Sequence, residues 1–325
     1  MDEIRNRNDL INILSTLVKS RVEIIFFVLC LIAAMIFVPN FANPQNLGNI
    51  LWQSSELIIL STGMTFVFMN GGIDFSITAV LPLCSVIGAE IMIHMNNSGI
   101  SVVLAVVTML AIGFSIGVIN GFSVTILKMP SFIATMATQL IFAGVALTIT
   151  QSSTIGNISP DFLNIAQGNT LGLPNAAIIT VLVVIITAYA LHFTVYGRQI
   201  AAIGTNHRAS IISGIPIKKR IFSLFVISSL LASLASIVMS AKNGAGMPGL
   251  GKDMLMDVIA SVIIGGTSII GGYGNIIGTV IGSILVLSLN NCLNLIGIDW
   301  YYINVCKGAL ILCVAMLDIM RNKNR

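Results

Sequence analysis

The sequence predicts an all-α polytopic membrane protein with about ten transmembrane helices, because its composition and its apolar runs both require lipid. Of its 325 residues, 56% are hydrophobic and only 9% are charged, and the mean hydropathy is +0.98. Charged residues make up about 25% of a typical soluble domain, so this composition excludes a water-soluble fold. Most of the apolar runs are long enough to cross a bilayer as helices, which takes about 20 residues, and they lack the alternation of membrane β-barrel strands.

Ten apolar runs are expected to cross the membrane. In chain order they are 22–38, 50–69, 75–93, 100–127, 131–150, 174–193, 221–241, 255–270, 275–296 and 301–319. The first run follows Lys19 and Arg21, as the apolar part of a signal peptide would. Its length and the many later runs favour an uncleaved first helix instead.

The positive charges orient these helices. With the N-terminus in the cytoplasm, the inside segments hold all but three of the 16 Lys and Arg residues, as the positive-inside rule requires. The exceptions are Lys242 and Lys252, which fall in outside loops, and Lys307, which lies within the last run. Because the number of helices is even, both termini are expected in the cytoplasm.

Two of the connections are long. Residues 151–173 form an outside loop whose only charge is Asp161, and residues 194–220 form an inside loop that is basic and carries Gly, Asn and Ser. No soluble domain is indicated. The expected organisation is a single membrane domain, 1–325, with a cytoplasmic head at 1–21 and a cytoplasmic tail at 320–325.

The first motif is GGIDFS at residues 71–76, between the second and third runs. Gly71 and Gly72 are expected to break the helix, which leaves Asp74 at membrane depth, where a carboxylate costs on the order of 2.5–3.5 kcal/mol. Two interpretations stay open. Asp74 caps the next helix by accepting from its first N–H groups, or the motif, with Ser76, takes a direct part in the passage of a solute.

The second motif is GGTSIIGGYGN at residues 265–275, which interrupts the eighth and ninth runs. Short, glycine-broken spans at corresponding places are typical of a transport pathway, and both breaks approach the cytoplasmic face in this topology. Their likeness suggests an internal duplication, and local flexibility without function is the alternative. The expected break residues here are Gly265, Gly266, Thr267 and Ser268.

Two glycine ladders recur every four residues, at Gly113, Gly117 and Gly121 in the fourth run and at Gly274, Gly278 and Gly282 in the ninth. Glycine at this spacing lets two helix backbones approach closely in lipid. The ladders therefore predict helix packing rather than chemistry.

No catalytic or metal-binding pattern is recognisable. The five Cys lie in apolar runs without metal-ligand spacing, and the three His are scattered without an HExxH pattern. The stretch 246–253 fits GxxxxGK but continues with Asp253 instead of Ser or Thr and follows no strand, so it is not expected to bind a nucleotide. We expect no enzyme activity, no metal and no cofactor in this chain, and no nucleic-acid partner.

The remaining carboxylates indicate no specific function. Glu56 and Glu90 are expected near the outer ends of their helices, either lining a path or lying at the interface. Asp253, Asp257 and Asp299 fall near the outer face, where they would meet a partner or water.

The ordered set of motifs resembles the ribose-type permeases of the ATP-binding cassette (ABC) superfamily, which also holds branched-chain amino acid permeases. The resemblance covers nearly the whole chain. Besides GGIDFS and Gly265 to Ser268, it rests on Tyr196-Gly197-Arg198, on residues 202–206 and 213–215, on Asn290-Asn291, on Tyr301-Tyr302 and on Lys307 through Asp318.

The resemblance implies a ten-helix permease of the bacterial plasma membrane that imports a sugar, such as a ribose-like monosaccharide, by alternating access. Two permease subunits, either copies or paralogues, would sit on cytoplasmic ATPases that bind ATP and Mg²⁺, and an extracytoplasmic binding protein would deliver the sugar. The loop after the sixth helix would carry the coupling helix that docks on the ATPase. The positions implied in or beside that helix are Gly204, Asn206, Arg208, Ala209, Ser213 and Gly214.

The sequence departs from the family pattern at three places. Phe75-Ser76-Ile77-Thr78 stands where the family usually has Leu-Ser-Val-Gly, His207-Arg208-Ala209 replaces an acidic residue and two alanines, and Glu56 is unexpected. Alternatives therefore stay open: a related permease for branched-chain amino acids or nucleosides, or an ATPase-independent secondary transporter.

Overall fold

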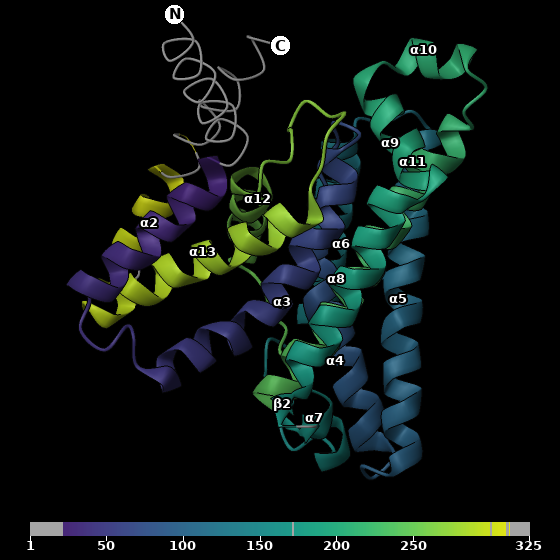
Figure 1. The fold of residues 1–325 in the computed structure, drawn as a ribbon. Coiled ribbons are helices and arrows are strands. Elements are labelled where there is room, and N and C mark those ends of the chain that lie inside the picture. Colours follow the sequence, from purple (N-terminus) through teal and green to yellow (C-terminus); the bar gives the residue numbers. More distant parts are fainter. Residues whose placement is uncertain (1–21, 171, 300, 310–311, 313–325) are drawn as a thin grey trace, which may run out of the picture.

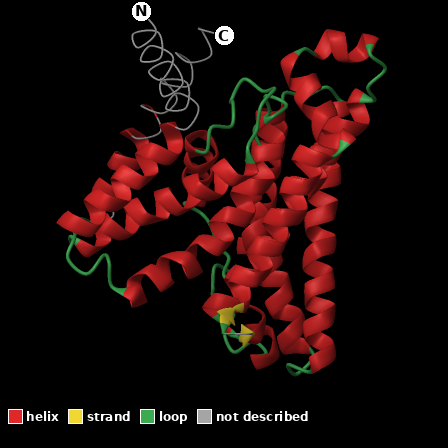
Figure 2. Cartoon of the chain, viewed as in Figure 1, coloured by secondary structure: helices red, strands yellow, loops and turns green. Residues whose placement is uncertain are grey.

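The computed structural model of the chain describes residues 22–170, 172–299, 301–309 and 312. Most of this part is helical (Figure 1, Figure 2), and its only paired strands are β1 (Asn169–Thr170) and β2 (Leu173–Pro174), which run antiparallel. The helices are α2 (Val22–Phe37), α3 (Pro44–Phe68), α4 (Ile77–His94), α5 (Gly99–Thr125), α6 (Ser131–Thr150), α7 (Pro160–Gln167), α8 (Asn175–Phe193), α9 (Val195–Thr205), α10 (His207–Ile212), α11 (Ile217–Asn243), α12 (Met254–Ile264) and α13 (Ile276–Leu295), followed by a helical segment at 301–309.

Helix α3 joins two groups of helices. In Figure 1, α2 and α13 lie with the first half of α3 on one side, while α4, α5 and α11 stand side by side on the other. The most apolar 18-residue stretch of α3 is 78% buried, whereas those of α5, α6 and α8 are only 22–28% buried. A helix that is apolar all round is buried in the protein interior or in lipid. We therefore place α3 at the centre and α5, α6 and α8 against the bilayer.

The fold class that the sequence predicts is confirmed, but the count of ten spans is not. Among the described residues, seven helices are long and apolar enough to cross a membrane: α3, α4, α5, α6, α8, α11 and α13. Helix α2 has 16 residues and α12 has 11, both below the roughly 20 residues of a full span. The expected tenth run, 301–319, is described only over 301–309 and at 312, and the head 1–21 and the tail 320–325 lie outside the described residues.

Three boundaries differ for local reasons. The second helix begins at Pro44, six residues before the expected start, because Asn43 caps it by accepting a hydrogen bond from the Gln45 backbone N–H at 3.0 Å. Helix α12 ends at Ile264 instead of 270, because Gly265 begins an irregular turn. The expected inside loop 194–220 is itself largely helical, as α9 and α10.

Glycines in α5 lie against α11. A Cβ added at Gly113 would stand 2.6 Å from the Cβ of Ser233, and one at Gly117 would stand 2.7 Å from the Cα of Val226. At Gly121 it would meet the Phe222 carbonyl oxygen at 3.0 Å. At Gly113 and Gly117 no other residue type fits without moving one helix, so these two glycines set how closely the two helices pack.

Candidate functional site

The first glycine break follows the end of α3. The N–H of Gly71 donates to the Phe68 carbonyl at 2.8 Å, and the N–H of Gly72 donates back to Val67 at 3.2 Å. Gly71 has a φ of +71°, a left-handed conformation that favours glycine. The chain therefore turns sharply at Gly71 before it reaches Asp74.

Asp74 is fully buried just before α4. Its Oδ1 accepts from the backbone N–H of Ser76 at 3.0 Å and from the Ser76 hydroxyl at 2.5 Å. Ser76 is the N-cap residue of α4 and makes no side-chain cap bond of its own. The Asp74 carboxyl group thus holds the start of α4 through the N–H of the N-cap residue. This N–H lies one position before the first helical N–H groups.

A buried polar network extends from Ser76 into α5 and α6. The Asn120 side-chain amide donates to the Ser76 hydroxyl at 2.8 Å, and the Thr138 hydroxyl donates to the Asn120 side-chain oxygen at 2.9 Å. Beside it, the Phe75 backbone N–H donates to the Thr135 hydroxyl at 3.1 Å. The first break is therefore fixed to α5 and α6 through side chains far away in sequence.

The second break, residues 265–275, is a tight turn between α12 and α13. Gly266, Gly271 and Gly272 have φ values of +81°, +102° and +86°. The Ser268 N–H donates to the Tyr273 carbonyl at 3.1 Å, and the buried Thr267 hydroxyl accepts from the Asn275 N–H at 3.3 Å. These bonds give the turn a defined shape rather than a loose one.

Glycines of α13 lie against this turn and α12. A Cβ added at Gly278 would stand 2.0 Å from the Gly265 carbonyl oxygen, and one at Gly282 would stand 2.2 Å from the Ser261 carbonyl oxygen. At Gly274 the nearest atom would be Met69 Cγ at 2.5 Å. Helices α12 and α13 therefore meet backbone to backbone at the second break.

The two breaks meet each other. The Gly272 N–H donates to the Met69 carbonyl at 2.8 Å, and a Cβ on Gly71 would stand 2.9 Å from the Ile270 carbonyl oxygen. Segments about two hundred residues apart in sequence thus form one backbone junction. Sequence reasoning identified both breaks but gave no reason to place them in contact.

The last turn of α9 completes this junction. A Cβ on Gly204 would stand 1.9 Å from the Met69 carbonyl oxygen and 2.4 Å from the Gly272 nitrogen, and a Cβ on Gly272 would stand 2.6 Å from Thr205 Oγ1. We call these three segments, 69–72, 270–274 and 204–205, the three-way junction. A displacement of α9 must therefore move backbone atoms at both helix breaks.

Directly after the junction the chain forms α10, which projects at one end of the molecule (Figure 1). Asn206 caps α10 by accepting from the Ala209 N–H at 3.0 Å, and Gly214 ends the turn with a φ of +74°. Arg208, Ala209 and Ser213 are exposed, as are Ile211 and Ile212, the latter to 88%. An exposed cation beside two exposed isoleucines is suited to protein contact.

Helix α9 is held to the start of α11 by side chains. The Tyr196 hydroxyl lies 2.7 Å from the Ser223 hydroxyl, the Arg220 guanidinium lies 5.1 Å from the centre of the Tyr196 ring, and Arg220 Nε donates to Gln199 at 2.6 Å. Burial raises the pKa of Tyr196 above its ordinary value. The phenol thus stays protonated, and α9 and α11 are fixed as one unit.

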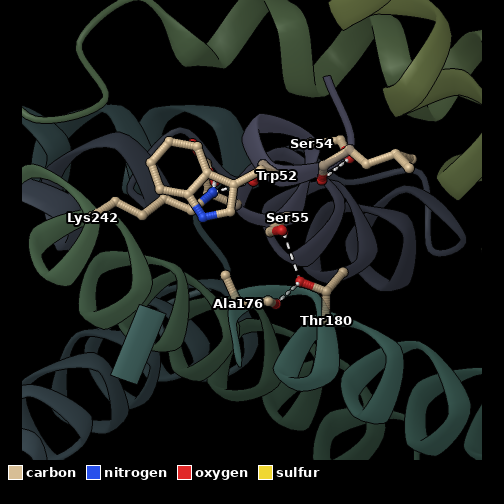
Figure 3. A network of polar contacts seen from close by, with 8 residues as sticks. Trp52, Ser54, Ser55, Ala176, Thr180 and Lys242 are labelled. Carbon is tan, nitrogen blue, oxygen red and sulfur yellow. Dashed lines mark hydrogen bonds and ion pairs between the residues drawn. The ribbon is translucent and has the colours of Figure 1, made fainter. Parts of the chain in front are cut away.

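The structure also joins two charges that the sequence placed apart. Lys242, expected in an outside loop, lies in the last turn of α11 and pairs with Glu56 of α3 at 2.5 Å, with both side chains largely buried. Its ammonium also donates to the Trp52 carbonyl and lies 4.5 Å from the Trp52 ring centre (Figure 3). Nearby, the Thr180 hydroxyl of α8 contacts the Ser55 carbonyl oxygen at 3.4 Å (Figure 3).

A second, half-buried pair joins Asp257 of α12 to Lys307 of the segment 301–309, with a distance of 3.0 Å to each carboxylate oxygen. The pair lies beside Asn290 in a cavity of about 170 Å³ whose other lining residues are mostly apolar. Asp257 is thus held by an ion pair rather than simply solvated.

The described residues contain no group of three or more His, Cys, Asp or Glu placed to hold a metal. The GxxxxGK-like stretch is a turn that follows α11, where Gly246 forms a two-way backbone bridge with Ile155 at 2.8 Å in both directions.

Comparison with known proteins shows which protein family the chain belongs to. Residues 46–315 match the family model described as branched-chain amino acid transport system / permease component. The chain belongs to this permease family. It is therefore a multi-pass transport protein of the membrane.

Among its relatives, the chain is 38% identical to the ribose import permease protein of Bacillus subtilis, over 90% of each chain. It is 36% identical to the ribose import permease protein of Escherichia coli K12, over 86% of this chain and 87% of the relative. It is 33% identical to the D-allose transport system permease protein of the same strain, over 92% and 91%. No solved structure matches the chain.

Proposed function

We propose that this permease is the membrane-spanning subunit of an ATP-driven importer of a sugar, a ribose-like monosaccharide or related carbohydrate. The observation that carries the proposal is the similarity to ribose import permeases across nine-tenths of both chains. The D-allose relative extends the similarity to a second sugar transporter. A permease for branched-chain amino acids or nucleosides is the alternative, and the family description supports it only at the level of the general plan.

The proposed partners follow from the two faces of the chain. A cytoplasmic ABC ATPase, which binds ATP and Mg²⁺, docks on the surface formed by Arg208, Ile211 and Ile212 of α10. A second permease, a copy or a paralogue, completes the transmembrane unit, and an extracytoplasmic binding protein delivers the sugar. The whole chain acts as one permease domain in the bacterial plasma membrane, with both termini in the cytoplasm.

The proposed mechanism is alternating access. ATP binding moves the docked ATPase and with it α10 and α9. Because Gly204 lies against both Met69 and Gly272, this movement changes the end of α3 and the turn between α12 and α13 together. The breaks at 71–76 and 265–268 then reorient the helices around the solute path. This chain performs no chemistry, since the free energy comes from the partner's ATP.

Two substitutions in the docking segment test the coupling. Arg208→Glu reverses the exposed charge, and Gly214→Pro forces a φ near −65° where the chain needs +74°. In membranes that hold normal amounts of each variant, we expect ATP hydrolysis to continue while uptake falls. Lys252→Glu, an exposed site on the opposite end, serves as control. Normal uptake by both α10 variants would contradict docking at this segment.

The nature of the solute is tested separately. The binding protein that co-purifies with the permease is denatured, and the released solute is identified by mass spectrometry. A sugar supports the proposal, whereas a branched-chain amino acid or a nucleoside establishes the alternative. A permease that transports solute without any co-purifying ATPase would instead be a secondary transporter.

A further inference from the structure

The end of α5 lies beside the start of α11. A Cβ on Gly113 would meet Ser233, whereas one on Gly121, two turns later in α5, would meet Phe222, more than two turns earlier in α11. The two helices therefore run antiparallel. Their packing brings the last turn of α5 to the first turn of α11, at the end of the molecule where α10 projects (Figure 1).

Three lysines gather at this end. Lys128 lies in the turn that follows α5, and Lys218 and Lys219 lie in the first turn of α11. Because Lys218 and Lys219 precede Phe222 by about one helical turn, they share the side of α11 that faces α5. All three side chains are exposed. We call these three lysines the basic cluster.

The basic cluster has no countercharge on the helices around it. None of the ion pairs among the described residues involves one of its members. Helices α5, α9, α10 and α11 fall within segments 91–160 and 162–252, which contain no Asp or Glu. Arg220, the next residue of α11, is by contrast held by Gln199 and Tyr196. The three lysines are therefore free to bind an anionic partner.

The surface next to the cluster faces lipid. The most apolar 18-residue stretch of α5 is only 28% buried. At the end of this helix, Phe122, Ile126 and Leu127 are 48%, 51% and 58% exposed. Exposed apolar side chains directly beside cations are typical of the level at which acyl chains give way to headgroups. This position favours a lipid over a soluble protein as the partner.

We propose that the basic cluster binds the phosphate headgroups of anionic phospholipids, whose acyl chains lie along the exposed apolar side chains at the end of α5. The positive-inside rule explains why basic residues lie on one side of a membrane. It does not require cations from two helices to converge without a countercharge.

A headgroup held between Lys128 and Lys218 joins the end of α5 to the start of α11. Helix α11 is also the helix to which Tyr196 fixes α9. The bound lipid thus steadies the base from which α9 and α10 extend. The inference does not depend on which solute the protein transports or on where an ATPase docks.

Lipid retention by the purified full chain tests the proposal. The permease is reconstituted in vesicles of equal parts phosphatidylglycerol and phosphatidylcholine and extracted in mild detergent, and the retained lipids are counted by native mass spectrometry. We expect the anionic lipid to be retained in clear excess. Equal retention of the two lipids by the unaltered protein would overturn the proposal without the need for any variant.

The double variant Lys218→Gln/Lys219→Gln should lose most of this excess, since each cation strengthens attraction to an anionic surface about fivefold. The matched control is Arg208→Gln/Lys252→Gln, which removes the same charge from exposed sites on α10 and after α11 and should keep the excess. Equal losses in the two double variants would show that only net charge matters. That result, or an unchanged excess in Lys218→Gln/Lys219→Gln, would contradict binding at the cluster.

Lys128→Gln tests whether both helices contribute. A site shared between α5 and α11 predicts that this single change lowers the excess of phosphatidylglycerol by about fivefold. Retention at the level of the unaltered protein would contradict a headgroup held between the two helices.

Discussion

The carbonyl oxygen of Met69 lies so close to Gly204 that a Cβ on that glycine would stand only 1.9 Å from it. The same oxygen accepts the Gly272 N–H at 2.8 Å. One backbone atom therefore joins the end of the central helix, the turn before α13 and the segment that leads to α10. In the proposed mechanism, this geometry would transmit movement of α10 to the helix breaks.

Gly204→Val should separate α9 from both breaks. The two added methyl groups and the Cβ cannot fit beside Met69 and Gly272, and overpacking of this kind costs about 1–3 kcal/mol. We expect ATP-dependent uptake to fall sharply while the ATPase still binds α10. The control is Gly144→Val in α6, where a Cβ meets nothing within 4 Å. Equal uptake by the two variants would argue against transmission through Gly204.

The Glu56–Lys242 pair should behave as a desolvated ion pair. Glu56→Gln or Lys242→Met alone leaves one buried charge without its partner, which typically costs about 3–5 kcal/mol. The double variant Glu56→Gln/Lys242→Met should cost clearly less than the sum of the two. Thermal unfolding in detergent measures the three changes, with Lys252→Met at an exposed site as control. Additive effects of the single changes would show that the two charges act independently.

Gly117→Ala tests the close packing of α5 on α11. The new Cβ would lie 2.7 Å from the Cα of Val226, which neither backbone can avoid without moving. The expected loss is about 1–3 kcal/mol, seen as a lower unfolding temperature. Gly99→Ala at the start of the same helix meets nothing within 4 Å and should be neutral or slightly stabilising. A neutral Gly117→Ala would mean that the helices are free to separate there.

The folded protein should lose stability at alkaline pH as the Tyr196 phenol ionises. Its pKa is raised by burial, so the folded state prefers the protonated phenol, and ionisation favours unfolding once the pH exceeds the ordinary value of about 10. Unfolding temperatures should therefore fall less steeply with rising pH for Tyr196→Phe than for the unaltered protein. Tyr189→Phe, at an exposed tyrosine in α8, should leave the slope unchanged. Parallel slopes for Tyr196→Phe and the unaltered protein would contradict a buried, protonated phenol.

The sequence predicted what uniform apolar runs and glycine punctuation determine. The run 131–150 coincides with α6, and the glycines at 71–72 and 265–266 were recognised as breaks because they interrupt otherwise continuous helices. The expected end of α12 at residue 270 was wrong, because Ile269 and Ile270 lie within the turn and yet prolong the apolar run. Apolar composition reports affinity for lipid, and it carries no information on where a backbone stops being helical.

Contacts between distant segments could not be predicted from the sequence. Glu56 and Lys242 are 186 positions apart, and nothing local in either segment indicates the other. A lysine in a polar stretch is normally expected to face water. Here the Lys242 ammonium, in the last turn of α11, instead contacts Trp52 and Glu56. The junction of Met69 with Gly272 depends on backbone atoms alone, which leave no mark in residue identities except the glycines that allow the approach.

Proteoliposomes provide the most direct test of the central proposal, that a cytoplasmic ATPase docked on α10 drives solute through this chain. The permease is reconstituted with its co-purifying ATPase and binding protein, and sugar uptake is followed with ATP, without ATP and without the ATPase. We expect uptake only when the ATPase and ATP are both present. Uptake at the full rate from vesicles that contain the permease alone would contradict it.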